Sequence, residues 1–424
     1  MALDQTAKFD HVPCMANVSG TIDIDDPGAL LRALLLQQEA NSATSLVAGH
    51  LVCNGASTST EIVTATRLSR ASVSLALIDL RSHGIVIETN ASVQDGASRG
   101  RGRPQMKQSI AANIGFAAGV LLGLREIRIL FSDAAHNKIA DVSLPIAIDY
   151  SPQDALTLLH KKLKDLTKAS GTLIEEMLGI GIAVAAPVSP QGQIAASSIM
   201  PSWDGVDLSK EFASSFPCPV YADNESNCAA QSKMLWGAAR GFRDFVYVTF
   251  DYGIGGAIVY DGRVRRGIDG YAAEIGHIPV EHPGALCRCG KYGCLETLAS
   301  VDTVLQKLSD KKHYPISLET LRELVESRDK GALAVVREAG ERCGQALAMI
   351  SSILSPSHYF LDGIMTGLGS PFLDPLRTTF LSHTRGHPPE IIEATESFDD
   401  TVRGAIGLVF RQQGLLKTVG SKDA

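Results

Sequence analysis

The chain lacks several features that would place it outside the cytoplasm. Its longest apolar stretches are broken by Gly, Ser or charged residues well before the roughly 20 residues that a membrane-spanning helix needs. The first residues, MALDQTAKFDHVPC, have neither the basic start nor the apolar core of a secretion signal. Five of the eight cysteines show no spacing typical of a disulfide framework: Cys14, Cys53, Cys218, Cys228 and Cys343. We therefore expect a cytoplasmic protein with reduced thiols and no membrane partner.

An overall positive charge is also missing. The formal net charge of -7 argues against a protein that coats nucleic acid over its whole surface. One segment is nevertheless basic. Residues 59 to 107 hold seven basic residues, Arg67, Arg70, Arg81, Arg99, Arg101, Arg103 and Lys107, against the four acidic residues Glu61, Asp79, Glu88 and Asp95. A local basic patch on an acidic chain is typical of a protein that meets DNA with one face.

Size and composition indicate a globular protein of several domains. At 424 residues the chain is too long for one ordinary core and suggests two or three domains. Hydrophobic residues make up 45% and charged residues 20%, as in globular proteins. We find no short-period internal repeat.

The run GHIPVEHPGALCRCGKYGCLE brings three cysteines and one histidine into eighteen residues, and these are His277, Cys287, Cys289 and Cys294. Three thiolates and one imidazole form a complete tetrahedral zinc set. Every ligand position is then filled by protein, which leaves no place for a catalytic water, so the pattern predicts a structural Zn²⁺. The alternative is a chance cluster of small buried cysteines.

The N-terminal region reads as a tail followed by helices. Residues 1–27 are acidic and without periodicity, and we expect them to be poorly ordered. A helical pattern runs from residue 28 and closes at Asn54 and Gly55. Thr58 followed by Glu61 is a capping box that opens a short helix, EIVTATRL.

A second helix, RASVSLALIDLRSHG, follows after a tight turn and is capped by Ser69. A short helix, a turn and a longer helix predict a helix-turn-helix. The start of the second helix would then contact DNA, through Ser69, Arg70, Ser72, Val73 and Ser74. Two amphipathic helices of an ordinary bundle would give the same pattern.

The next segment predicts a wing. IVIE reads as a strand, and DGASRGRGRPQ reads as a Gly-rich and Arg-rich loop. Arg99, Arg101 and Arg103 would form a basic finger that is narrow enough for the minor groove. A solvated linker between domains is the alternative for this loop.

After Lys107 the composition changes to Gly-punctuated apolar strands separated by longer helical segments, which favours an α/β region with two lobes. Two stretches, near residues 113 to 145 and 246 to 266, look like two copies of a similar strand meander.

With the His/Cys run, the strand VTFDYGIGGAIVYDG and the winged helix-turn-helix ending in GRP, the chain resembles the ROK family of repressors and sugar kinases over residues 30 to 415. The resemblance implies an α/β two-lobed core, like that of actin and hexokinase, preceded by a winged helix-turn-helix. We expect a tail at 1–27, a DNA-binding domain at 28–107 and a sugar-binding domain at 108–424. The two lobes of the latter would be 108–231 plus 403–424, and 232–402.

The resemblance also implies a sugar cleft between the lobes. Asn224, Glu225, Glu274, His277 and Glu296 would contact sugar hydroxyls. Carboxylates and an amide on rigid turns suit hydroxyls that both donate and accept hydrogen bonds. His277 could serve twice, with one ring nitrogen on zinc and the other on the sugar. Trp203 would be either a core residue or a wall of the cleft.

Three departures from the kinase pattern bear on activity. The Asp-x-Gly-Gly-Thr phosphate loop of the kinases aligns with Leu121 to Arg125, which lacks the carboxylate and the hydroxyl. In the second phosphate hairpin, Asp251 and Tyr252 precede Gly253, and a negative charge there would repel phosphates. Glu225 stands where the kinases have their catalytic Asp, and misplacing such a base by about an ångström costs roughly a hundredfold in rate.

The sequence therefore predicts a sugar-responsive regulator without enzymatic activity, most simply a repressor that binds a double-stranded DNA operator as a homodimer or a dimer of dimers. Sugar binding would close the lobes and reorient the DNA-binding domains. Two alternatives remain: an active ATP-dependent sugar kinase, and a regulator controlled by a protein partner with a vestigial cleft.

Overall fold

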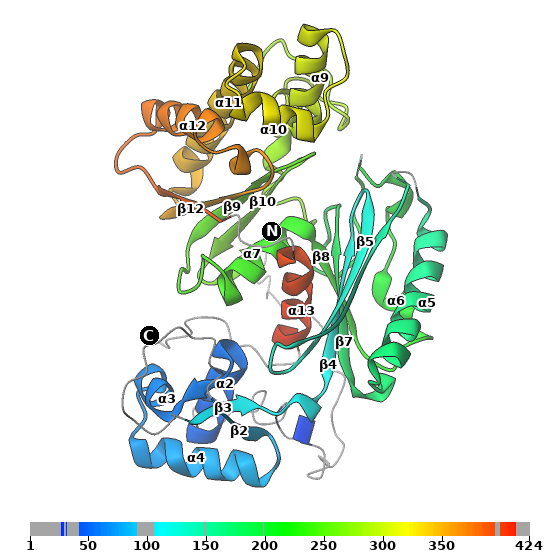
Figure 1. The fold of residues 1–424 in the computed structure, drawn as a ribbon, viewed down its shortest axis with the longest axis vertical. Helices are drawn as coiled ribbons and strands as arrows, with labels where there is room; N and C mark the ends of the chain where they lie inside the picture. The colour runs from blue at the N-terminus through cyan, green and yellow to red at the C-terminus, as the bar shows by residue number, and fades with distance from the viewer. Residues whose placement is uncertain are drawn as a thin grey trace, which may run out of the picture.

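The structure, a computed structural model, describes residues 27–28, 31, 42–90, 106–147, 150–197, 199–394 and 399–412. These residues form an N-terminal unit with a three-stranded sheet and two lobes that are each built on a five-stranded sheet (Figure 1). The two lobes confirm the expected α/β core. None of the helices within these ranges is long and apolar enough to span a bilayer.

From residue 42 on, the described part of the N-terminal unit contains helices and a small antiparallel sheet, in the order α2 (Ala43–Asn54), β1 (Ser57–Thr58), α3 (Ser59–Thr66), α4 (Arg70–Ser82), β2 (Val86–Asn90) and β3 (Met106–Ile110). The predicted capping box is confirmed. The amide of Glu61 donates to the Thr58 hydroxyl at 3.2 Å, and the amide of Thr58 donates to the Glu61 carboxylate at 2.7 Å. Ser69 caps α4 by accepting from the amide of Ser72 at 3.0 Å.

The first lobe is built on a sheet of strand order β6-β5-β4-β7-β8. Its strands are β4 (Phe116–Leu122), β5 (Glu126–Asp133), β6 (Lys138–Pro145), β7 (Met177–Val184) and β8 (Val220–Asn224). The amphipathic α5 (Pro152–Ser170) packs Leu159 and Leu163 into the same core as Phe212 of α6 (Leu208–Ala213). These helices cover the outer face of the sheet (Figure 1).

The second lobe repeats this topology with the strand order β11-β10-β9-β12-β13. Its strands are β9 (Phe245–Phe250), β10 (Ile254–Tyr260), β11 (Arg263–Arg265), β12 (His358–Asp362) and β13 (Glu390–Glu393). In both sheets an antiparallel meander pairs with a later parallel strand, which confirms the predicted likeness of the two meanders. The helices of this lobe are α8 (Glu296–Ala299), α9 (Val301–Lys312), α10 (Leu318–Glu326), α11 (Lys330–Leu354) and α12 (Ser370–His383).

Two helices lie between the sheets. α13 (Asp400–Gln412) packs on the inner face of the first sheet, and α7 (Glu225–Trp236) packs between α13 and the second sheet (Figure 1). The helices approach closely because Gly404 has no side chain, and a β-carbon there would lie 1.7 Å from the carbonyl oxygen of Cys228. This crossing places the start of α7 between the two lobes.

A buried lysine joins the lobes at this crossing. Lys233 of α7 is fully buried, and its ammonium lies 2.6 Å from a carboxylate oxygen of Asp400, at the start of α13. The same ammonium lies 3.2 Å from Asp362, at the end of β12 in the second lobe. A buried charge of this kind is tolerated only when it is paired, so Lys233 holds α7, α13 and β12 in one arrangement.

The N-terminal unit is packed against the first lobe. Leu51 and Val52 of α2 belong to one hydrophobic cluster with Ile406 and Phe410 of α13. A ring nitrogen of His136, in the turn after β5, bonds to the carbonyl oxygen of Val52. A shift of α13 or of the first sheet would therefore displace α2.

Candidate functional site

The four predicted metal ligands come together in one loop of the second lobe. His277 lies in a single 3-10 turn after β11, and the cysteines follow in a loop braced by short bridges between Pro279 and Cys294 and between Leu286 and Tyr292. Gly290 and Gly293 adopt positive φ angles of 83° and 72°. Such angles suit glycine, and they let the chain turn back to bring in Cys294.

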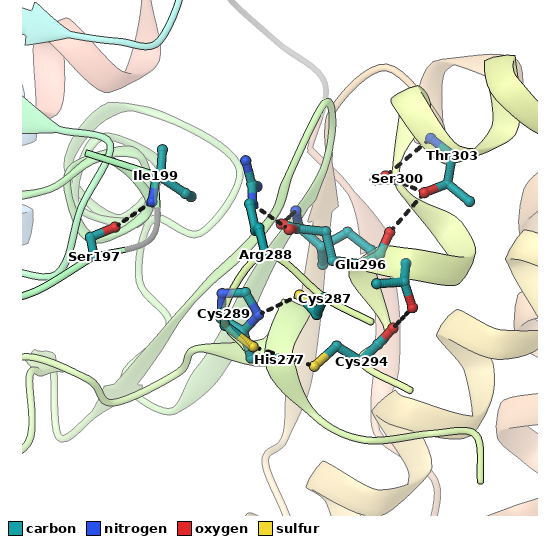
Figure 2. A network of polar contacts seen from close by, with 12 residues as sticks. Ser197, Ile199, His277, Cys287, Arg288, Cys289, Cys294, Glu296, Ser300 and Thr303 are labelled. Carbon is teal, nitrogen blue, oxygen red and sulfur yellow. Dashed lines mark hydrogen bonds and ion pairs between the residues drawn. The ribbon is translucent and has the colours of Figure 1, made fainter. Parts of the chain in front are cut away.

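The spacing of these ligand atoms fits a metal ion. All four atoms lie within 4.8 Å of one another. Sγ of Cys287 lies 3.6 Å from Nδ1 of His277, and Sγ of Cys289 lies 3.7 Å from Sγ of Cys294 (Figure 2). Ligands placed tetrahedrally about 2.1 to 2.3 Å from one ion are separated by roughly 3.5 to 3.8 Å. The four side chains could therefore hold one tetrahedral ion.

His277 has a second ring nitrogen that faces away from the thiols. Nδ1 is directed to Cys287, whereas Nε2 lies 3.8 Å from a carboxylate oxygen of Glu274. Burial lowers the pKa of this imidazole, which favours the neutral form that ligates metals. The metal loop and the predicted cleft thus meet at one side chain.

Glu225 is the first residue of α7 and lies where the two lobes meet. Gly255 of β10 makes room for this end of the helix, because a β-carbon there would lie 2.2 Å from Oγ of Ser226. Burial, together with the charge of Asp251, raises the pKa of Glu225 to about 7, and the charges of Arg288 and Glu274 act on it in opposite directions. A carboxyl group with this pKa changes between its protonated and ionised forms near neutral pH.

Glu274 and Glu296 complete a group of three carboxyls with Glu225. Burial and the charge of Glu296 raise the pKa of Glu274 to about 7. Glu296 begins α8 and is buried, and one of its oxygens accepts from the amide of Ile254 at 3.3 Å. The structure thus brings these three predicted residues and His277 to one place.

Arg288 is a member of this group that sequence reasoning missed. It lies between the predicted ligands Cys287 and Cys289, and its Nε donates to Glu296 at 2.7 Å, away from the thiols (Figure 2). Its guanidinium also reaches Gly253, where a β-carbon would lie 3.2 Å from Nη2. The sequence signal that could have identified Arg288 is its position between two predicted ligand cysteines. The conformation of that loop determines where its side chain points.

Asn224 has a structural role in addition to its predicted one. Its side-chain oxygen caps α7 by accepting from the amide of Ser226 at 2.8 Å, and its side-chain nitrogen donates to the carbonyl of Ala186 at 3.1 Å. An amide can make more bonds than these two. Asn224 can therefore bind a ligand only through the donor and acceptor sites of its amide that these two hydrogen bonds leave unused.

The two loops that were predicted to match the phosphate loops of kinases touch each other. The guanidinium carbon of Arg125, in the β4–β5 turn, lies 4.5 Å from the centre of the Tyr252 ring, in the β9–β10 turn. Arg125 also lies 3.7 Å from the carboxylate of Asp302, at the start of α9. Arg125 belongs to the first lobe and the other two residues to the second. These side chains therefore bridge the lobes at this point.

Asp251, whose negative charge was predicted to repel phosphates, directs its carboxylate into its own lobe. Its carboxylate accepts from the amide of Ile364 at 2.9 Å and from the hydroxyl of Thr249 at 2.8 Å. Burial raises the pKa of this carboxyl group. The side chain braces the β9–β10 turn, and Tyr252 is the residue of this turn that contacts the other lobe, through Arg125 of the β4–β5 turn.

The structure alters the predicted DNA-contacting set. Val73 is only 1% exposed and packs in the core of the N-terminal unit, so it cannot reach a base. Ser72 is half-buried and shares a hydrogen bond with the cap Ser69. Arg70 and Ser74 are exposed on α4. The three arginines of the predicted finger, Arg99, Arg101 and Arg103, lie outside the described residues.

Trp203 is a core residue. It is buried, it belongs to the core of the first lobe, and its ring meets that of Tyr150 edge-on at 5.7 Å. Of the two roles that the sequence left open for it, the structure supports packing.

Comparisons with known proteins identify one family for this chain. Residues 117–412 match the ROK family. A putative xylose repressor of Caldicellulosiruptor sp. (strain Rt8B.4) is 28% identical over 323 residues, which cover 73% of this chain and 80% of that protein.

Solved structures agree on the fold. A ROK family transcriptional regulator, a homologue of the E. coli MLC protein, superimposes with a TM-score of 0.71 at 22% identity, over 91% of this chain and 97% of that one. A ROK family glucokinase from Streptomyces griseus, in complex with glucose and AMPPNP, superimposes with a TM-score of 0.62 at 24% identity, over 70% of this chain and 100% of that one.

Proposed function

Because the chain belongs to the ROK family, we propose that it is a DNA-binding transcriptional regulator whose kinase-like core senses a sugar or sugar derivative. In this role it represses carbohydrate-utilisation genes. When the effector binds, the protein either dissociates from its operator or changes its arrangement on it. The observation that carries the proposal is the capped helix pair α3 and α4, packed against the same first lobe that forms one side of the cleft. The similarity to a putative xylose repressor supports it.

The N-terminal unit is interpreted as a winged helix-turn-helix spanning residues 28–107. α3 and α4 are the helix-turn-helix, and β2 and β3 are the stem of the wing. α4 would lie in the major groove, with Arg70 and Ser74 toward the DNA, while the finger with Arg99, Arg101 and Arg103 would enter the minor groove. Residues 108–424 would form the sensor. The lobe boundaries expected from the sequence, 231/232 and 402/403, fall within α7 and α13.

The effector site is assigned to Glu225, Glu274, Glu296 and Nε2 of His277, with Arg288 added to the set. Carboxylates accept hydrogen bonds from sugar hydroxyls, and the guanidinium and the imidazole can donate to sugar oxygens. Because residues from both lobes line this site, an effector that binds here would favour one arrangement of the lobes over another.

A structural Zn²⁺ is assigned to His277, Cys287, Cys289 and Cys294. Four protein ligands leave the ion no open position, so it would hold the loop that carries Arg288 and join it to Glu274. Its function would be to fix the shape of the effector site and not to react.

We infer that the core does not phosphorylate sugars. The β4–β5 turn lacks the carboxylate and hydroxyl of the kinase phosphate loop, and the contact between Arg125 and Tyr252 lies between the two loops that would hold phosphates. The similarity to a glucokinase structure makes an active kinase the second candidate. Control by a protein partner, with a vestigial cleft, is the third.

The regulator is expected to act as a homodimer or a dimer of dimers in the cytoplasm, because two copies of a helix-turn-helix read a two-fold symmetric operator. The direct test is to select DNA sites from a random library with the full-length protein, then to titrate each selected site with a panel of monosaccharides and sugar phosphates.

The outcomes of this test separate the candidates. Specific sites that one effector releases or tightens support the regulator. When the protein is also incubated with ATP and the same panel, sugar-dependent ADP formation at about one per second or faster would move the kinase to first place. Specific sites with no response to any sugar would favour the protein-controlled alternative.

A further inference from the structure

The helix α4 exposes a continuous stripe along one side. Its buried residues Val73, Ala76, Leu77 and Leu80 face the core of the N-terminal unit. The opposite side carries Ala71, Ser74, Leu75, Ile78 and Ser82, and Arg70 is exposed beside this stripe in the first turn. In a helix-turn-helix this opposite side is the one that meets the base edges. Its composition therefore decides what the helix can read.

Two large apolar side chains lie in the middle of this stripe. Leu75 is 67% exposed and Ile78 is 56% exposed, one turn apart on the helix. Single exposed apolar residues are common on protein surfaces. Two adjacent apolar residues on the exposed side of a helix that contacts DNA are less common. They occupy positions from which their side chains would reach adjacent base pairs.

The polar side chains of α4 leave few ways to read bases by hydrogen bonds. Arg81 donates to the carbonyl of Leu77 at 3.1 Å and pairs with Glu88 on β2, so it is held at the back of the helix. Asp79 lies within 3.5 Å of His83 and carries the wrong charge for phosphates. Arg70 is left as the cation beside the stripe, and the described stripe has no Asn or Gln for an adenine edge.

The charges beside the stripe are of the sign that the phosphates of DNA would attract. Arg67, in the turn before α4, and Arg70, in its first turn, are both exposed at the amino-terminal end of the helix. Two cations beside an apolar stripe can contact phosphates on the rim of the major groove while the stripe lies inside it. The apolar feature that the major groove offers is the methyl group of thymine.

We propose that Leu75 and Ile78 are specificity-determining residues that select thymine methyl groups on neighbouring base pairs of each half-site. The inference rests on the proposed function and deepens it, because it states what the recognition helix reads. Arg67 and Arg70 position the helix on the backbone, and Ser74, which can bond to more than one base, adds little discrimination.

The test uses the full-length protein and a DNA site selected from a random library. Each thymine of the half-site is replaced in turn by deoxyuridine, which removes the methyl group and keeps the base pairing. Loss of one buried methyl should weaken binding by about fourfold. The expected pattern is one or two sensitive thymines per half-site and no effect at the others.

Matched protein variants assign each methyl to its side chain. Leu75→Ala should abolish the difference between thymine and deoxyuridine at one position, and Ile78→Ala should abolish it at another. Alanine at exposed helical positions preserves the helix, so these variants will fold. Leu173→Ala, which truncates a residue that is 59% exposed in the sensor, should keep both differences.

Three results would overturn the proposal. Specific binding that is equally strong with thymine and deoxyuridine at every position would mean that the stripe reads no methyl group, while the regulator itself stands. A change of oligomeric mass in Leu75→Ala or Ile78→Ala would assign the stripe to a protein contact. Failure to select any site would remove the proposed function and this inference together.

Discussion

Arg125 and Tyr252 lie face to face across the two lobes, with the guanidinium carbon 4.5 Å from the ring centre. Each residue lies in a turn that was predicted from the sequence to match a phosphate loop of the kinases. Tyr252 also packs against the core of the second lobe, so its ring is held in place. The contact therefore links the two lobes.

Breaking this link should shift the lobes from the arrangement in which Arg125 contacts Tyr252 toward a more open one. Arg125→Ala removes a partly exposed cation–π contact of about 0.5 to 1 kcal/mol, which shifts an open–closed equilibrium roughly two- to fivefold. The apparent effector affinity should weaken by up to this factor, as measured by calorimetry. Arg322→Ala, at an exposed position on α10, is the control. Equal affinities in the two variants would show that the contact does not hold the lobes.

The His/Cys cluster should contain one zinc ion per chain after purification, as measured by elemental analysis. Cys289→Ser should lower the zinc content, the melting temperature and the effector response together, because the ion joins the loop that carries Arg288 to His277. Cys218→Ser makes the same chemical change at a half-buried thiol outside the cluster and should retain the metal. A metal-free wild-type chain with normal stability and response would sink this assignment.

Removing Glu274 should disable the sensor and spare the DNA-binding unit. A charge-assisted hydrogen bond to a buried hydroxyl contributes about 1.5 to 3 kcal/mol, so Glu274→Ala should weaken effector binding roughly ten- to a hundredfold. Effector-free DNA affinity should stay unchanged, because α4 lies outside the cleft. Glu319→Ala, at an exposed position of α10, should change neither property. Both affinities can be measured by fluorescence anisotropy on the selected site.

Effector affinity should rise with pH up to about 7 and then level off. The raised pKa values of Glu225 and Glu274, each about 7, mean that both carboxyls are largely protonated in the free protein at acidic pH. Sugar hydroxyls donate to the ionised form, so binding at low pH must release a proton. The affinity then falls by about tenfold for each pH unit below 7 per proton released.

Glu225→Gln separates the two carboxyls in this titration. This variant should release one proton fewer than the wild type when the effector binds at low pH. Calorimetry in buffers of different ionisation enthalpy measures this number. In the effector-free wild type the same raised pKa values should make the folded state less stable as the pH rises from about 4.5 to 7. A pH-independent affinity over this range would show that neither carboxyl ionises on binding.

Lys233 should be a large contributor to stability. Lys233→Met leaves the carboxyls of Asp362 and Asp400 without their shared cation, and removing one partner of a buried ion pair costs about 3 to 5 kcal/mol in the free energy of unfolding. Lys307→Met breaks a half-exposed pair with Glu338 and should cost less than about 1 kcal/mol. Denaturant unfolding of the two variants measures the difference, and similar midpoints would contradict the assignment.

The sequence by itself determined the features that depend on neighbours along the chain. The capping box of Thr58 and Glu61, the cap at Ser69 and the His/Cys set were predictable because a helix cap or a metal loop is specified by residue types a few positions apart. The repeated strand meander was visible for the same reason, since alternating apolar strands and glycine turns are local patterns.

Only the tertiary structure decided which side of each element faces a partner. Val73 and Leu75 are two residues apart on one helix, and packing buries the first and exposes the second. Asp251 turns into its own lobe because the amide of Ile364, more than a hundred residues later, lies beside it. The pairing of Arg288 with Glu296 and of Arg125 with Tyr252 likewise depends on how loops and lobes meet in space, and no pattern along the chain records distances between segments that only folding brings together.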